Sequence, residues 1–114
     1  MRKIVFRGKT VDGGAWIRGY FVEMEGLPCI FINGTAVRVI PETVGQYVGL
    51  KDRDGMKIFE GDILESPIKR VDQSHGNLII IKDIRKCEFA ALYVAEYKVF
   101  GNIHDNSELL EDME

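Results

Sequence analysis

The strongest fold signal in the sequence is PCIFINGTAVRVI, residues 28–40. Two short runs of mostly apolar residues, 28–32 and 36–40, flank the turn Asn33-Gly34-Thr35. Asn-Gly is the dipeptide that best accepts the positive φ angles of a tight hairpin turn. The stretch therefore predicts a β-hairpin, and Pro41 ends it because proline has no amide proton to give to a strand ladder.

A second hairpin is predicted upstream of this one. Residues 3–7 and 15–22 have strand composition and flank Asp12-Gly13-Gly14, which accepts positive φ. Side chains alternate between the two faces of a strand, so Trp16 and Tyr20 share a face. Trp16 is the only tryptophan of the chain, and we expect it to anchor the core.

Short strands and turns continue downstream. Residues 45–50 and 56–59 flank Asp54-Gly55 and predict a third hairpin. Further strands are predicted at residues 63–66, 68–71 and 78–81, and the last of these is apolar enough to be buried on both faces.

The last third of the chain is less regular. Alanines in residues 87–100 permit a helix, but aromatic and β-branched residues favour two strands. A short C-terminal helix is predicted after Asn106, which we expect to be its N-cap, with Leu109 and Leu110 as its apolar contacts. The pattern predicts a mainly β fold, a small antiparallel barrel or roll. It forms a single domain, 1–114, with an N-terminal hairpin subdomain over residues 1–42.

Composition excludes several classes of protein. The 114 residues are 46% hydrophobic with a net charge of −3, which excludes a disordered tail. No run approaches the roughly 20 apolar residues of a membrane span, and the charged start is unlike a secretory signal. We therefore expect a cytoplasmic protein in which Cys29 and Cys87 are small buried hydrophobes.

Charge is unevenly distributed along the chain. Residues 1–20 carry five basic side chains and one acidic one, whereas residues 101–114 carry five acidic and no basic ones. The two ends are expected to attract each other, within one chain or between copies, or to be two independent solvated surfaces.

No motif indicates catalysis, a metal or a cofactor. The residues around Gly55 do not have the spacing of a calcium-binding loop. Basic residues are interleaved with Asp52, Asp54, Glu60 and Asp62, which indicates a solvated loop whose charges compensate one another. Nothing in the spacing makes Cys87, His104 and Asp105 a nucleophilic arrangement. We expect no catalytic residues, no metal ligands and no cofactor.

Three blocks of the sequence resemble one known family. They are GQYVGLKDRDGMKIFEGDI (45–63), MRKIVFRGK (1–9) with Trp16 and Gly19-Tyr20 after it, and GNIHDNSELL (101–110). The chain resembles the YopX family of small proteins encoded by bacteriophages and prophages. It departs from that pattern at Val48, where threonine is usual, and at Ser107, where proline is expected. The resemblance implies an SH3-like barrel or roll and a bacterial host cell, and it transfers no activity and no catalytic residues.

The leading hypothesis is a non-enzymatic binding or assembly module that acts on a host or phage macromolecule. Small β-barrels commonly bind through exposed loops and edge strands. The candidate binding surface is the basic and aromatic start of the chain: Arg2, Lys3, Arg7, Lys9, Trp16, Arg18 and Tyr20.

Three alternatives stay open. The first is nucleic-acid binding by the same surface, and the acidic total weighs against it. It would be helped by a second basic group: Lys69, Arg70, Lys82, Arg85 and Lys86. The second is a homo-oligomer, formed through an unpaired hairpin edge or through the opposite charges of the two ends. The third is an enzyme, for which Cys87, His104 and the carboxylates of residues 52–62 are the only conceivable groups. No membrane partner is expected.

Overall fold

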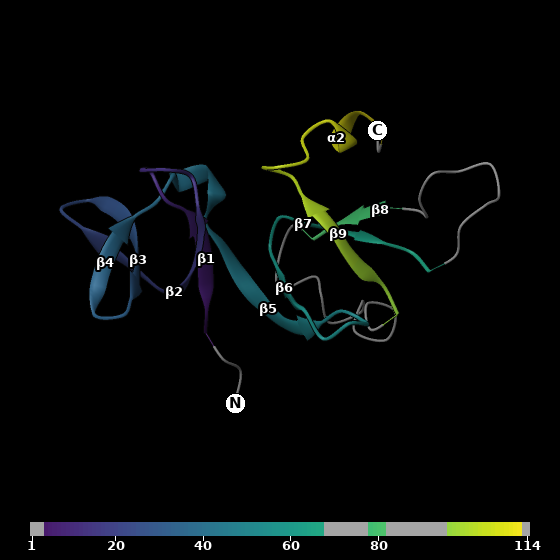
Figure 1. Cartoon of the computed structure of the whole chain (residues 1–114), viewed down its shortest axis with the longest axis horizontal. Helices are drawn as coiled ribbons and strands as arrows, with labels where there is room; N and C mark the ends of the chain where they lie inside the picture. Colours follow the sequence, from purple (N-terminus) through teal and green to yellow (C-terminus); the bar gives the residue numbers. More distant parts are fainter. Residues whose placement is uncertain (1–3, 68–77, 82–95, 113–114) are drawn as a thin grey trace. The chain divides into compact units, whose positions relative to one another are not determined.

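The computed structural model describes residues 4–67, 78–81 and 96–112 (Figure 1). The chain divides into two compact units, Met1–Tyr47 and Val48–Glu114. The hairpin subdomain predicted for residues 1–42 lies within the first unit. Strand β5 (Gly45–Lys51) begins in the first unit and ends in the second.

The first unit consists of consecutive antiparallel strands. They are β1 (Phe6–Lys9), β2 (Trp16–Met24), β3 (Leu27–Ile32) and β4 (Thr35–Arg38), followed by the 3-10 turn η1 (Pro41–Thr43). Each strand pairs with the next, and β5 pairs with the free side of β1 (Figure 1). Both hairpins predicted from the sequence are confirmed.

Two-residue turns with positive φ angles connect β2 to β3 and β3 to β4. The predicted turn between β3 and β4 has φ angles of 52° at Asn33 and 79° at Gly34. A further turn, between β2 and β3, has φ angles of 56° at Glu25 and 78° at Gly26. These are the angles of the turn that matches the right-handed twist of antiparallel strands. The β2–β3 hairpin was not predicted, because glutamate rarely adopts positive φ.

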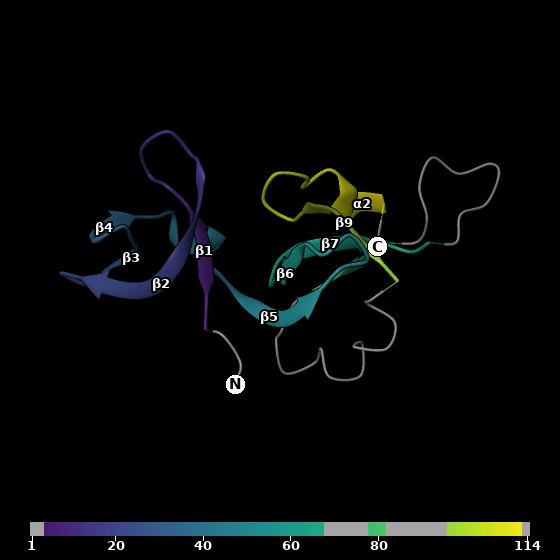
Figure 2. The same ribbon diagram turned by 60° about the horizontal axis from the view of Figure 1, so that its bottom comes forward.

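Strand β2 is long and curved, and it changes partner along its length (Figure 2). Residues 16–19 pair with β1, and residues 20–24 pair with β3. The change falls at Gly19, where a Cβ atom would collide with the backbone carbonyl oxygen of Phe31. Gly19 is therefore needed for the close approach of β3 to β2.

The inner face of the first unit forms its core. Ile30 and Val39 are fully buried, and the rings of Phe6 and Phe21 pack with centroids 5.5 Å apart. Trp16 is half-buried and lies on the opposite face of β2, so the expectation that it anchors the core is wrong. Strand alternation placed it on the face away from Phe21.

The second unit contains the rest of β5, β6 (Lys57–Phe59) and a three-stranded sheet. That sheet has β7 (Asp62–Glu65) between β8 (Leu78–Ile80) and β9 (Lys98–Asn102), with both pairs antiparallel (Figure 1). The core of this unit is formed by Val48, Ile58, Leu64 and Ile81. The predicted hairpin of β5 and β6 is confirmed.

Three predictions for the second unit have different outcomes. Residues 78–80 form a strand as expected. Of the four residues predicted to be buried, Ile81 is buried, whereas Leu78, Ile79 and Ile80 are half-buried. Within residues 87–100, the described residues include a strand, β9. The strand predicted at residues 68–71 lies outside the described residues.

The fold class is mainly β with antiparallel sheets, as predicted. A single bridge between Thr10 and Val39 links the end of β1 to the segment after β4. It does not extend into a ladder, and neither sheet of the described residues is closed, so an SH3-like barrel is not confirmed. None of the helices within residues 4–67, 78–81 and 96–112 has the length and apolar character needed to cross a membrane.

A single helical turn, α2 (Leu109–Asp112), follows β9. The expectation that the Asn106 side chain caps it is wrong, because the Asn106 side-chain oxygen accepts a hydrogen bond from the Asn102 N–H (3.1 Å). The Asn106 backbone carbonyl accepts the N–H of Leu109 (3.0 Å).

Candidate binding surface

One face of the strands in the first unit is defined by strand register, and its members range from the exposed Tyr20 to the buried Arg7 and Cys29. Because the pairings of β1, β2, β3 and β4 have no register shift, alternate residues of the four strands share one side. We call this side the cationic face. Its residues are Arg7, Lys9, Trp16, Arg18, Tyr20, Val22, Met24, Leu27, Cys29, Phe31, Ala36 and Arg38.

Charges of the first unit are segregated between its two sides. All four basic residues in its described part lie on the cationic face: Arg7, Lys9, Arg18 and Arg38. None of the four acidic residues in the same part does. Glu23 is on the opposite face of β2, and Asp12, Glu25 and Glu42 lie in turns. The cationic face therefore combines positive charge with no carboxylate of its own strands.

Trp16 organises two of these cations. The Arg7 guanidinium carbon lies 4.7 Å from the Trp16 ring centroid, and the Lys9 ammonium lies 5.6 Å from it. Lys9 is directly opposite Trp16 in the β1–β2 pairing. Each contact is in the range of a cation–π interaction, worth about 0.5–2 kcal/mol. Trp16 thus fixes where the β1 cations lie, which is a positioning role and not an open stacking surface.

Two aromatic side chains are exposed on the same face. Tyr20 and Phe31 are directly opposite each other on β2 and β3, and they are 66% and 42% exposed. Directly opposite residues of an antiparallel pair have Cβ atoms about 5 Å apart. The face therefore carries two neighbouring aromatic rings in contact with solvent.

The structure brings together five of the seven predicted binding residues. Arg7, Lys9, Trp16, Arg18 and Tyr20 all lie on the cationic face. Arg2 and Lys3 lie outside the described residues, as does the second basic group at residues 69–70 and 82–86.

Sequence reasoning missed Phe31 and Arg38. Both belong to the second hairpin, whose alignment with the first depends on the β2–β3 turn at Glu25-Gly26. A two-residue turn at Glu25-Gly26 would have indicated their places. Counting back from that turn puts Phe31 opposite Tyr20 on the same face.

The acidic loop of the second unit differs from the prediction. Asp52 is only 5% exposed, and its Oδ1 accepts the N–H groups of Asp54 (2.9 Å) and Met56 (2.8 Å). Its Oδ2 accepts the N–H of Val99 (3.0 Å). The Oδ2 of the buried Asp62 accepts the Phe59 N–H (2.8 Å). These two carboxylates are structural, so the solvated loop predicted for residues 52–62 is wrong at both positions.

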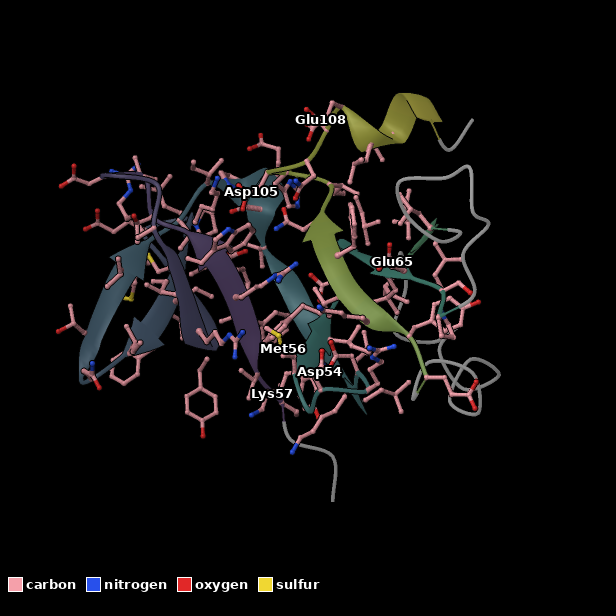
Figure 3. The ribbon with its side chains drawn as sticks, turned by 45° about the vertical axis from the view of Figure 1, so that its right-hand side comes forward. Asp54, Met56, Lys57, Glu65, Asp105 and Glu108 are labelled. Atoms are coloured by element: carbon pink, nitrogen blue, oxygen red, sulfur yellow. The ribbon has the colours of Figure 1, made fainter. Side chains whose placement is uncertain are left out.

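Hydrogen bonding determines the ionisation of Asp52. Burial alone would raise its pKa, but the bonds from Val99, Met56 and Asp54 outweigh burial, and the nearby Lys98 charge adds to them. The net effect lowers the pKa of Asp52 below its ordinary value. Asp54 and Met56 lie in the turn between β5 and β6, and Lys57 begins β6 (Figure 3).

The segment around His104 is a loop stabilised by hydrogen bonds among its own residues. The Asn102 side-chain oxygen accepts the N–H groups of His104 (3.0 Å) and Asp105 (2.9 Å), and its amide nitrogen donates to Asp105 Oδ2 (3.2 Å). Asp105 and Glu108 follow β9 on the way to α2 (Figure 3). Cys87 lies outside the described residues. No group of three histidine, cysteine or acidic side chains that could hold a metal occurs in the described part of the chain.

Fold and surface define an antiparallel β protein with a basic, aromatic face on its N-terminal unit. The chain belongs to the YopX protein family, whose model matches residues 28–111. It is similar in structure to protein EF1440 from Enterococcus faecalis, known from a crystal structure, with a TM-score of 0.60 and 23% identity. That similarity covers 96% of this chain and 99% of the other, and it concerns the fold. No curated protein matches the sequence.

Proposed function

We propose that this protein is a non-enzymatic binding module that holds a macromolecule on its cationic face. The observation that carries the proposal is charge segregation. Arg7, Lys9, Arg18 and Arg38 lie on one side of the sheet, and the four acidic residues of the same described segment lie elsewhere. A solvated surface without a role normally mixes charges of both signs.

The state of the acidic residues supports a role without catalysis. Asp52 and Asp62, the buried carboxylates among the described residues, accept backbone N–H groups and contribute to loop structure. A general acid or base needs a carboxyl group that can reach a substrate.

The proposal includes a phage or prophage origin and a location in the cytoplasm of a bacterial host. Its support is the resemblance of residues 45–63 and 101–110 to phage and prophage proteins, together with membership of the YopX family.

Affinity purification with matched variants tests the proposal. Tagged protein is expressed in bacterial cells with and without prophage induction, and the retained proteins and nucleic acids are compared. The face variant is Arg18→Glu/Arg38→Glu. The control is Lys51→Glu/Arg53→Glu, which reverses the same number of exposed charges on the second unit.

We expect the wild type and the control to retain the same macromolecule and the face variant to lose it. If the face variant retains everything that the wild type retains, the cationic face is not the binding surface. Circular dichroism of each variant verifies that the charge reversals leave the β-structure intact.

A further inference from the structure

We propose that the cationic face binds single-stranded nucleic acid, with bases stacked on Tyr20 and Phe31 and phosphates contacted by Lys9, Arg18 and Arg38. This inference rests on the proposed function and names the class of ligand. It assigns the base-contacting role to the Tyr20–Phe31 pair and not to Trp16, whose ring contacts Arg7 and Lys9.

The aromatic pair is the first reason. Tyr20 and Phe31 lie opposite each other on β2 and β3, and both are substantially exposed. Burying the exposed apolar surface of these rings against a ligand would contribute about 25 cal/mol per Å² to binding. Antiparallel sheets bind single strands by stacking bases on exposed aromatic side chains, because every base has a π face. A duplex keeps its bases stacked on each other, so the pair favours a single strand.

Cations flank the aromatic pair on both sides. Arg18 precedes Tyr20 by two residues on β2, and it therefore lies on the same face about 6.6 Å along the strand. On the other side, Ala36 of β4 is opposite Phe31, and Arg38 follows Ala36 by two residues on the same face. A strand stacked on the two rings would thus have basic side chains along its phosphates in both directions.

The Trp16 ring restricts the position of a further cation, Lys9. Lys9 lies 5.6 Å from the Trp16 ring and directly opposite Trp16 in the strand pairing. A cation that is already positioned loses less side-chain entropy when it contacts a phosphate. The absence of carboxylates from the described strands of this face leaves no repulsion against an anionic backbone there.

An acidic peptide would use the cations but would not need two adjacent rings. The two classes of ligand therefore differ in their dependence on Tyr20 and Phe31. Replacing each ring by leucine keeps an apolar side chain of similar size, so the fold is preserved while the π face is lost.

Fluorescence anisotropy with labelled oligonucleotides of about 12 nucleotides tests the inference, because this length is within the site sizes of small β-sheet binders. The probes are oligo-dT, oligo-rU and a DNA duplex of the same length, and a glutamate-rich peptide represents acidic proteins. Binding is measured with the full chain at several salt concentrations.

We expect oligo-dT or oligo-rU to bind more tightly than the duplex and the peptide. Tyr20→Leu and Phe31→Leu should each weaken single-strand binding about tenfold, and Tyr20→Phe should keep the wild-type affinity. The matched aromatic control is Phe100→Leu on β9, whose side chain is 41% exposed, and it should have no effect.

The cations predict the salt dependence. Arg18→Gln and Arg38→Gln should each reduce the slope of log K against log salt by about 0.7, the value for one phosphate contact on a single strand. Lys51→Gln, an exposed cation of the second unit, should leave the slope unchanged.

Failure of the inference is distinguishable from failure of the proposed function. If neither oligonucleotide binds, or if both leucine variants bind like the wild type, the ligand is not a stacked single strand. Should the peptide bind instead, with dependence on Arg18 and Arg38 alone, the cationic face stands as a protein-binding surface. Both proposals fall if the oligonucleotides do not bind and the cellular purification shows no dependence on Arg18 and Arg38.

Discussion

Asp52 is the residue that ties the turn after β5 to β9. Its two carboxylate oxygens accept three backbone N–H groups, two from its own turn and one from Val99, which is 47 positions away in sequence. Hydrogen bonds to an ionised acceptor are stronger than those between neutral groups. The short sequence Asp52-Arg53-Asp54-Gly55 is therefore a connection between two strands as well as a turn.

The first prediction concerns the removal of this charge. Asp52→Asn should lower the free energy of unfolding by about 2–4 kcal/mol, because the new amide NH₂ would face an N–H donor and leave it unsatisfied. Urea denaturation measures the change. The matched control, Asp54→Asn, alters an exposed carboxylate of the same turn and should change stability by less than about 0.5 kcal/mol. Equal effects of the two substitutions would contradict the assignment.

The second prediction is the pH dependence of the same interaction. The folded-state pKa of Asp52 is lowered from an ordinary value of 3.8, so its contribution to stability is present above that value. It is lost as the pH falls through the still lower folded-state pKa. The stability difference between wild type and Asp52→Asn should therefore be constant near neutral pH and shrink as the pH falls below about 4. A difference that stays constant in acid would sink this explanation.

The third prediction concerns Gly101, which does not have positive φ. A Cβ atom there would collide with the side-chain oxygen of Asn106, which accepts the Asn102 N–H. Gly101→Ala should destabilise the protein by about 1–3 kcal/mol. Combining it with Asn106→Ala should cost less than the two single changes together, because the colliding atom is gone. Additive effects in thermal or urea denaturation would show that the two residues do not oppose each other.

At the scale of elements, β2 determines the architecture of the first unit. It pairs with β1 through residues 16–19 and with β3 through residues 20–24. This one strand therefore joins the two parts of the cationic face. Its first half lies beside the cations of β1, and its second half contributes Tyr20 to the aromatic pair with β3. The cationic face exists because this change of partner occurs without a register shift.

The fourth prediction tests that change of partner. Gly19→Ala places a Cβ atom against the Phe31 carbonyl oxygen, and β3 must move away from β2 to accommodate it. We expect a loss of about 1–3 kcal/mol in the free energy of unfolding and faster hydrogen exchange in β3. Thr35→Ala, at an exposed position of β4, is the control and should leave the exchange of β3 unchanged. Unchanged exchange in Gly19→Ala would show that β3 does not depend on this close approach.

Local sequence patterns predicted the elements better than their connections. Asn33-Gly34 and Asp12-Gly13-Gly14 identified two hairpins, because those residues accept positive φ at low cost. Glu25-Gly26 gave only half of that signal, so the β2–β3 pairing and the places of Phe31 and Arg38 were missed. The burial of Asp52 could not be foreseen either, since a charged turn is normally solvated and one of its donors comes from β9.

At the scale of the whole molecule, the two structural units differ in the sign of their net charge. The first unit has six basic and four acidic residues, and the second has nine basic and fourteen acidic ones. The net charge of −3 therefore conceals a positive unit and a negative one. Net charge therefore favours the first unit over the second for an anionic ligand.

The fifth prediction concerns the cooperativity of the two units. Each has its own buried residues: Ile30 and Val39 in the first, Ile58 and Leu64 in the second. A change that destabilises only the second unit should therefore open that unit before the first. Asp52→Asn is such a change, because every partner of Asp52 described above lies between residues 54 and 99. Native-state hydrogen exchange should show lost protection in β6, β7 and β9 and unchanged protection in β2 and β3. If protection falls equally in all strands, the chain unfolds as one cooperative body, and the two units are a division of the structure without a division of stability.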